Sequence, residues 1–170
     1  MSVLLKRKIE SDQVPSIIQK LKLDNETPDV LIPYIQINFH DKHRAQLPAL
    51  IELSRKIEMV HEDDPDCPAG LADVLTNIWQ KLDSHMLKEE SVLFPMLLKG
   101  MKEMARTPIS VMLLEHEQHE QGIDRLLKVT GNLLLPDSAC GSWEKLYSGI
   151  GEFVEDLRLH LALENEVLFK

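Results

Sequence analysis

The chain has 170 residues, a length that favours one domain with a full hydrophobic core. Apolar residues make up 44% of it, aromatic residues only 5%, and there are seven glycines, which argues against a β-sandwich or β-barrel and favours an all-α fold. The net charge of −9 repels a phosphate backbone, so we expect no nucleic-acid partner.

The first 30 residues differ in pattern from the rest. They lack the apolar run of about 7–15 residues and the cleavage site of a secretory signal. No segment of the chain approaches the roughly 20 apolar residues of a membrane span, so we predict no membrane partner and a cytoplasmic location. Residues 3–23 predict a short amphipathic helix, broken near Pro15, that packs on the main domain or on a partner. The predicted division is an N-terminal extension over residues 1–30 and a main domain over residues 31–170.

Turn-forming residues divide the main domain into four long segments. The breaks are DNETPD at 24–29, HEDDPDCPAG at 61–70 and LLPDSACGS at 134–142, with a weaker one, KGMKEMARTP, at 99–108. Between them, apolar residues recur at spacings of three and four, which is typical of amphipathic helices. Four such helices with short connections predict an up-down-up-down bundle.

The first two helices carry polar residues on their apolar faces. The first, predicted from about Pro33 to His61 with a kink or split at Pro48, has one face made of His40, His43, Leu47, Leu50, Ser54 and Ile57. The second has an unbroken stripe made of Leu71, Leu75, Ile78, Leu82, His85, Glu89, Val92 and Met96.

The third and fourth helices show the same interruption. The third stripe contains Ile109, Met112, His116, then His119 or Glu120, then Ile123, Leu127, Thr130 and Leu134. The fourth contains Trp143, Leu146, Ile150, Phe153, Leu157, His160, Glu164 and Val167. Every predicted core face therefore includes at least one histidine. Burying so many ionisable groups without partners would cost several kcal/mol each, so something must compensate them.

The polar interruptions are also repeated along the chain. HMLKEESVLF begins at His85, and HLALENEVLF begins at His160, 75 residues later. The pair His40 and His43 is matched by His116 and His119, 76 residues later. A helical hairpin written twice predicts a pseudo-two-fold axis, with the four interruptions at the same level of the bundle.

A histidine and a glutamate four residues apart project from one helix face, so both can reach the same metal site. Two such pairs, with one more histidine from each of the other helices, give the candidate metal ligands His40, His85, Glu89, His116, His160 and Glu164. Four imidazoles and two carboxylates suit two metal ions about 3.5–4 Å apart that both carboxylates bridge. Ligation without thiolate fits iron or manganese, and zinc is compatible. Such a set leaves positions open for an oxo bridge, dioxygen, nitric oxide or water.

Each of these residues has an ordinary structural alternative, since a single buried histidine is usually a hydrogen-bonded core residue; the coincidence of four interrupted stripes favours the metal site. His43 and His119 are either metal ligands or residues beside the site. We expect His61 to end the first helix. Glu115, Glu117 and Glu120 are expected in solvent, with Glu120 an alternative ligand, and Cys67 and Cys140 as reduced thiols in loops.

Four strings of this sequence resemble a known family. FHDKHRAQLPALI, SHMLKEESVLFPML, PISVMLLEHEQH and LRLHLALENEVLF are similar to the hemerythrin-like domain of the bacterial iron-sulfur cluster repair di-iron proteins, over roughly residues 33–169. The resemblance implies the same six ligands, with Glu89 and Glu164 bridging two iron ions in an oxo- or hydroxo-bridged di-iron centre. Family members begin with a small domain that carries a Cys-Cys pair, whereas residues 1–32 here contain no cysteine. Hemerythrins themselves use a fifth histidine and an aspartate where this chain has Glu120 and Glu164.

The resemblance implies a non-haem di-iron protein that helps to repair iron-sulfur clusters damaged by nitric oxide or oxidants. The alternative is a hemerythrin-like module that binds, buffers or senses dioxygen or nitric oxide without turnover. A slow redox enzyme acting on nitric oxide or peroxide is a third hypothesis. The expected partners are these gases and damaged iron-sulfur proteins, and a homodimer is left open.

Overall fold

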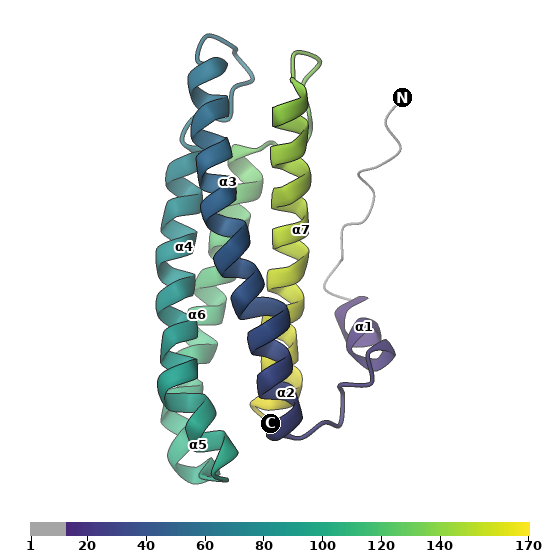
Figure 1. The fold of residues 1–170 in the computed structure, drawn as a ribbon, viewed down its shortest axis with the longest axis vertical. Coiled ribbons are helices and arrows are strands. Elements are labelled where there is room, and N and C mark those ends of the chain that lie inside the picture. Colours follow the sequence, from purple (N-terminus) through teal and green to yellow (C-terminus); the bar gives the residue numbers. More distant parts are fainter. Residues whose placement is uncertain (1–12) are drawn as a thin grey trace.

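Four long helical columns run antiparallel in the computed structural model, which describes residues 13–170 (Figure 1). The columns are α2 (Pro28–Ile35), the π-helical turn η2 (Gln36–His40) and α3 (Asp41–Val60); α4 (Leu71–Lys88), the π-helical turn η3 (Glu89–Leu93) and α5 (Phe94–Leu98); α6 (Lys102–Val129); and α7 (Gly141–Leu163) with the π-helical turn η4 (Glu164–Leu168). Both α3 and α6 contact α4 and α7, so each column has two antiparallel neighbours. The predicted all-α, up-down-up-down four-helix bundle is confirmed.

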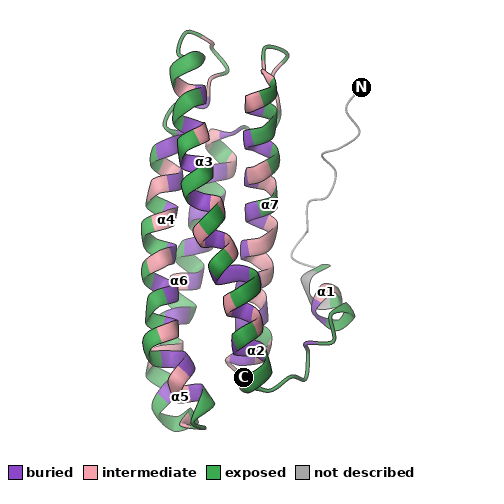
Figure 2. Cartoon of the chain, viewed as in Figure 1, coloured by how far each residue is buried: buried purple, intermediate pink, exposed green. Residues whose placement is uncertain are grey.

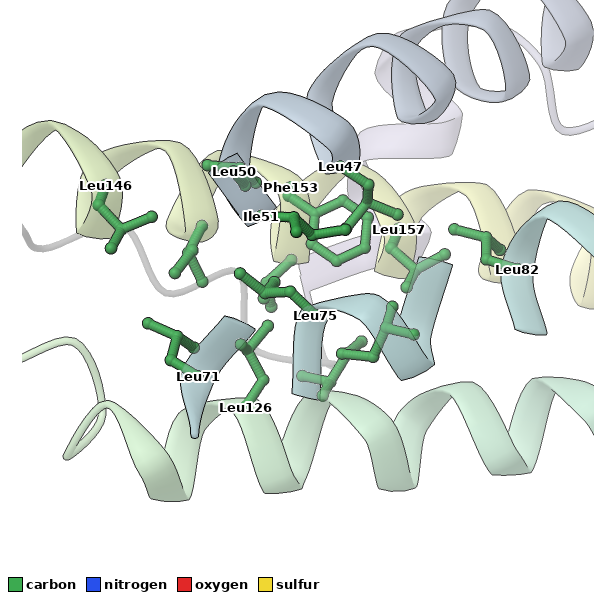
Figure 3. Close-up of a cluster of buried hydrophobic side chains, with 14 of the residues drawn as sticks. Leu47, Leu50, Ile51, Leu71, Leu75, Leu82, Leu126, Leu146, Phe153 and Leu157 are labelled. Carbon is green, nitrogen blue, oxygen red and sulfur yellow. The ribbon is translucent and has the colours of Figure 1, made fainter. Parts of the chain in front are cut away.

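Two apolar clusters fill the interior, one toward each end of the bundle. The cluster nearer the top of Figure 1, called the upper cluster, includes Leu47, Leu75 and Phe153. Figure 3 shows its side chains converging from α3, α4, α6 and α7. The lower cluster includes Phe39 and Phe94. Buried positions face the inside of the bundle along every column, while exposed ones face outward (Figure 2). Along each column, the histidines and glutamates of the predicted core face lie between residues of the upper cluster and residues of the lower cluster.

Prolines alter the helices less than the sequence suggested. The first column begins at Pro28 rather than Pro33, and α3 continues through Pro48 without splitting. The third column begins at Lys102, so the predicted break up to Pro108 ends seven residues early. Each internal proline removes one backbone donor, but the packing of a long apolar face outweighs the loss.

The predicted stripes are correct along most of their length and wrong beyond the π-helical turns. Val92, predicted on the core face, is 50% exposed, and the next residue, Leu93, is 1% exposed. A π-helical turn contains one more residue than an α-helical turn, so the face that follows it shifts by one position. Leu134 is also misplaced, because α6 ends at Val129 and Leu134 lies in the following loop.

The N-terminal extension packs on the bundle, one of the two predicted arrangements. Its helix α1 (Val14–Lys20) contains Pro15 in its first turn and contacts α7. Ile18 and Leu23 are buried in the lower cluster. The first twelve residues of the predicted extension lie outside the described part of the chain. Among the described helices, none is both long enough and apolar enough to cross a membrane.

Candidate metal centre

The six predicted ligands meet in the interior of the bundle. Each column contributes one histidine, and the second and fourth also contribute the glutamates that open η3 and η4. Five of the six side chains are completely buried, and His116 is 3% exposed. Their donor atoms form two groups: His40 and His160 in one, His85 and His116 in the other, with Glu89 and Glu164 common to both. The ligand atoms within each group lie within 4.8 Å of one another.

The carboxylates extend across both groups. Glu89 places Oε2 3.4 Å from Nε2 of His40 and Oε1 3.4 Å from Nε2 of His85. Glu164 places Oε1 3.1 Å from Nε2 of His160 and Oε2 3.2 Å from Nε2 of His116. One oxygen of each glutamate thus faces each group, which is the arrangement of a carboxylate that bridges two metal ions.

The π-helical turns explain how the glutamates reach the centre. In α4, His85 lies one turn before Glu89, and η3 begins at this glutamate. In α7, His160 and Glu164 repeat that arrangement with η4. On the first column η2 ends at His40. Single π-helical turns inside α-helices occur frequently at functional sites, and here they coincide with three of the six candidate ligands.

Three of the four carboxylate oxygens at the centre lack a protein hydrogen-bond partner among the described residues. Within the described residues, both carboxylate oxygens of Glu89 and Oε2 of Glu164 are buried without a hydrogen-bond donor in good geometry. Buried carboxylate oxygens are normally hydrogen-bonded, paired or coordinated to metal. The unpartnered oxygens and the converging imidazole nitrogens therefore fit divalent cations.

The protonation of the cluster follows from its burial. Burial lowers the pKa of His40 to about 4, with a further lowering from His160, and lowers the pKa of His85 to about 3. These imidazoles are neutral near pH 7, the form that binds a metal. Burial, followed by the charge of Glu164, raises the pKa of Glu89. Burial also acts to raise the pKa of Glu164, but His160 and His116 outweigh it and the pKa falls. Without a cation, the paired carboxyls therefore favour one shared proton.

An outer layer of hydrogen bonds turns each histidine toward the centre. Nδ1 of His40 lies 2.7 Å from Oε1 of Glu90, and Nδ1 of His85 lies 2.9 Å from Oε2 of Glu115. On the other two ligands, Nδ1 of His116 lies 2.7 Å from Oδ1 of Asn165, and Nδ1 of His160 lies 3.2 Å from Nε2 of His43. When Nδ1 donates its proton to an outer partner, the lone pair of Nε2 faces the carboxylates. Such partners set the tautomer and orientation of ligand histidines.

Basic residues hold the two outer glutamates in place. Arg44 donates from Nη1 and Nη2 to the two oxygens of Glu90 at 2.8 and 3.0 Å. Burial acts to raise the pKa of Glu90, but the hydrogen bond from Arg44 and then that from His40 outweigh it, so the pKa falls. On the other side of the centre, Lys88 pairs through Nζ with one oxygen of Glu115. Glu90 is thereby kept charged and is a strong acceptor for Nδ1 of His40.

The structure places His43 and His119 beside the site rather than in its two ligand groups. His43 is fully buried and joins His160 to Gln46, whose amide donates to Asp156 at 2.8 Å. His119 is 4% exposed and packs edge-on against His85, but its Nε2 has no hydrogen-bond partner among the described residues.

Some of the remaining predictions for single residues are confirmed and one is wrong. Glu115 was expected in solvent, and this is wrong, because it accepts from His85. Glu117 is exposed as expected, while Glu120 pairs with Arg158 and belongs to neither ligand group. His61 ends α3, and Cys67 and Cys140 are free thiols outside the helices, all as predicted.

Sequence reasoning missed the outer partners Glu90, Glu115 and Asn165. One signal was present, since Glu90 and Asn165 directly follow the two bridging glutamates and occupy equivalent places in the repeat. Glu115 directly precedes His116, but its equivalent in the repeat is Phe39, whose ring stacks on His160. The repeat therefore offered no indication of the role of Glu115.

Comparison with known proteins gives a consistent result. Residues 34–170 match the family model described as the hemerythrin HHE cation binding domain. The chain is 50% identical over 139 residues to the iron-sulfur cluster repair protein YtfE of Dickeya chrysanthemi, and 48% identical over the same length to that of Pectobacterium atrosepticum. Each alignment covers 82% of this chain and 63% of the relative, so the chain spans less than two thirds of the length of these relatives. This chain belongs to the hemerythrin HHE cation-binding family.

Proposed function

We propose that this chain is a non-haem di-iron protein that takes part in the repair of iron-sulfur clusters damaged by nitric oxide or oxidants. The observation that carries the di-iron part is the bridging arrangement, in which each of two buried glutamates directs one oxygen to each of two histidine pairs. The repair role is supported by relatives that are 46–50% identical and are named iron-sulfur cluster repair proteins. Damaged iron-sulfur proteins are the proposed targets.

The proposed ligands are His40 and His160 for one iron ion and His85 and His116 for the other, with Glu89 and Glu164 shared. Iron bound there would supply one-electron redox chemistry and open positions for a small diatomic ligand. The chain's own residues orient the imidazoles through their Nδ1 partners, and His160 and His116 lower the pKa of Glu164 against the effect of burial. The two apolar clusters exclude bulk water from both sides of the centre.

The depth of the centre restricts what can reach it. Because the six ligands are at most 3% exposed, a protein or a large metabolite cannot contact them in this conformation. Nitric oxide and dioxygen are small enough to diffuse through packed side chains. This burial also favours the second candidate function, a module that binds or senses such a gas without turnover.

A recovery assay separates the two functions. A cluster-containing dehydratase is inactivated with nitric oxide and then incubated with the reduced, iron-loaded chain. Repair predicts that activity returns faster than with an equal amount of free ferrous iron, and that the doubly substituted Glu89→Ala, Glu164→Ala chain gives no gain over free iron. Equal recovery with the parent and the substituted chain would contradict the repair role.

The gas-binding function predicts a different pair of results. The reduced chain would give a nitrosyl spectrum that reverses when the gas is removed, and the dehydratase would not recover. The absorption spectrum and the enzyme activity can be followed in the same samples. Recovery together with loss of iron from the chain would instead support repair by iron donation.

A further inference from the structure

A cysteine and a histidine meet at the end of the bundle opposite the metal centre. Cys140 immediately precedes α7, and His61 ends α3, in the two loops at the top of Figure 1. Their side chains approach to 3.3 Å, measured from Sγ of Cys140 to Nε2 of His61. Cys140 and the candidate ligand His160 are twenty positions apart along α7 and its N-terminal cap, which is about 30 Å along a helix. The pair therefore has no part in metal binding.

The surroundings of Cys140 favour the thiolate. The hydrogen bond with His61 is the main cause that lowers the pKa of Cys140, and the backbone N–H groups of Trp143 and Ser142 act in the same direction. These N–H groups belong to the first turn of a 23-residue helix, where the helix dipole also stabilises a negative charge. The ring of His61 packs against Trp143, with ring centroids 4.9 Å apart, and this contact holds the imidazole beside the sulfur.

The chain contains an internal reference for this cysteine. Cys67 lies in the neighbouring loop and is half-buried, like Cys140. Its Sγ lies 4.0 Å from the carbonyl oxygen of Glu58, and within residues 13–170 no histidine forms a hydrogen bond with it. Burial raises the pKa of Cys67, and the charges of Glu58 and Asp64 raise it further. The two thiols of one molecule are thus placed in opposite environments.

We propose that Cys140 and His61 form a reactive thiol site that exchanges with small disulfides of neutral or positive charge. His61 accepts the proton of the thiol, and the thiolate attacks one sulfur of the reagent. The sulfur–sulfur bond of the reagent breaks as a new bond forms between Cys140 and the attacked sulfur. The second sulfur leaves as a thiolate and takes the proton from His61. Cys140 supplies the electron pair of the new bond, and the leaving sulfur keeps the electron pair of the broken one. The sulfur of Cys140 thus rises by one formal oxidation state and the leaving sulfur falls by one, so no further reactant is needed.

The preference for charge comes from the two loops. The loop that follows His61 carries Glu62, Asp63, Asp64 and Asp66, and the loop before Cys140 carries Asp137. Asp64, in the first loop, accepts a hydrogen bond from Ser138, in the second. This hydrogen bond is the main cause that lowers the pKa of Asp64. An anionic disulfide would therefore be repelled on approach, whereas a cationic one would be attracted.

The first experiment compares the two thiols within the parent chain. The full metal-loaded chain is treated with cystamine, and peptide mapping by mass spectrometry gives the rate of mixed-disulfide formation at each cysteine. We expect Cys140 to react at least about tenfold faster than Cys67 in the native chain, and the ratio to approach one in urea. Equal native rates, or a faster Cys67, would overturn the proposal. Because this comparison needs no substitution, it does not depend on the folding of a variant.

Two variants test the partner and the independence of the site. His61→Gln should slow Cys140 severalfold and leave Cys67 unchanged, while an unchanged Cys140 rate would show that the imidazole has no role. Cys140→Ser should abolish the fast reaction and keep the metal content of the parent. The reaction rate tests the proposed thiol site and the metal content tests the proposed metal centre, so one proposal can be contradicted without the other.

The charge preference is tested with oxidised glutathione, which is anionic, at the same concentration as cystamine. Reaction of Cys140 should be slower with glutathione, and the difference should shrink as salt is added. Equal rates at low salt would remove the charge preference from the proposal.

Discussion

At the residue scale, the centre is defined by which nitrogen of each histidine faces the carboxylates. All four histidines among the candidate ligands direct Nε2 inward, and all four have a partner for Nδ1. The partners differ in kind: two are carboxylates, one is an amide and one is the imidazole of His43. Through His43 the chain of hydrogen bonds continues to Gln46, and from there to Asp156.

The first prediction compares the two histidines that lie beside the site. Changing His43 to Ala removes the partner of His160, whereas the same change at His119 removes an imidazole whose Nε2 is unpaired. We expect His43→Ala to weaken ferrous iron binding by about 10–100-fold and His119→Ala to weaken it much less. Competition with a calibrated chelator measures both. Similar losses in the two variants would mean that packing, rather than the hydrogen bond, determines the effect.

At the element scale, the π-helical turns determine which residues follow the glutamates into the core. Regular helical spacing would continue the second stripe from Glu89 to Val92, but η3 adds one residue and buries Leu93 instead. The same shift follows Glu164, where Leu168 is buried and Val167 is only half-buried. The turns therefore link the position of each bridging carboxylate to the packing of the lower apolar cluster.

The register shift predicts opposite effects at two neighbouring positions. Leu93→Ala should lower the free energy of unfolding by about 2–5 kcal/mol, because it leaves a cavity in the lower cluster. Val92→Ala should change it by no more than about 0.5 kcal/mol, since that side chain is half in solvent. Urea unfolding of both variants provides the measurement. A larger loss at Val92 would show that the helix keeps the regular spacing in solution.

Helical periodicity also marks the limit of what the sequence could predict. The spacing of Leu71, Leu75, Ile78 and Leu82 sufficed to predict a core-facing helix. The doubled His-x-x-x-Glu pattern, with one histidine from each of the other two stripes, sufficed to propose the six ligands. It could not predict η3, because a π-helical turn depends on how the glutamate and its neighbours pack against other helices. It could not identify Glu115 either, since the partner of that glutamate, His85, lies on another helix and no pattern within one helix records the contact.

At the scale of the whole molecule, a polar centre lies between two apolar cores. Leu47, Leu82 and Leu157 belong to the upper core, and Phe39, Phe94 and Leu163 to the lower. Burying two carboxyl groups between these cores is unfavourable without cations. The free energy lost when an unpaired charge leaves water is larger than the free energy gained from packing around it. Metal binding to the folded chain therefore contributes directly to stability.

Glu89→Gln tests whether this carboxyl group destabilises the metal-free chain while stabilising the metal-bound chain. In the presence of a chelator, the variant should unfold at a higher temperature than the parent, because it replaces a buried carboxyl whose oxygens have no hydrogen-bond donor. In the presence of iron, the order should reverse, because the amide is a poorer ligand. The same substitution at exposed Glu117 is the control and should change neither temperature. A metal-free parent that is more stable than the metal-free variant would contradict this account.

The central claim is that Glu89 and Glu164 bridge two iron ions, and metal content per chain tests it most directly. Elemental analysis is carried out on the parent, on Glu89→Ala and on Glu164→Ala, each loaded with ferrous iron under anaerobic conditions. The account predicts about two iron ions per parent chain and a clear fall in both variants. A parent that holds no iron, or variants that retain the full content of the parent, would contradict it.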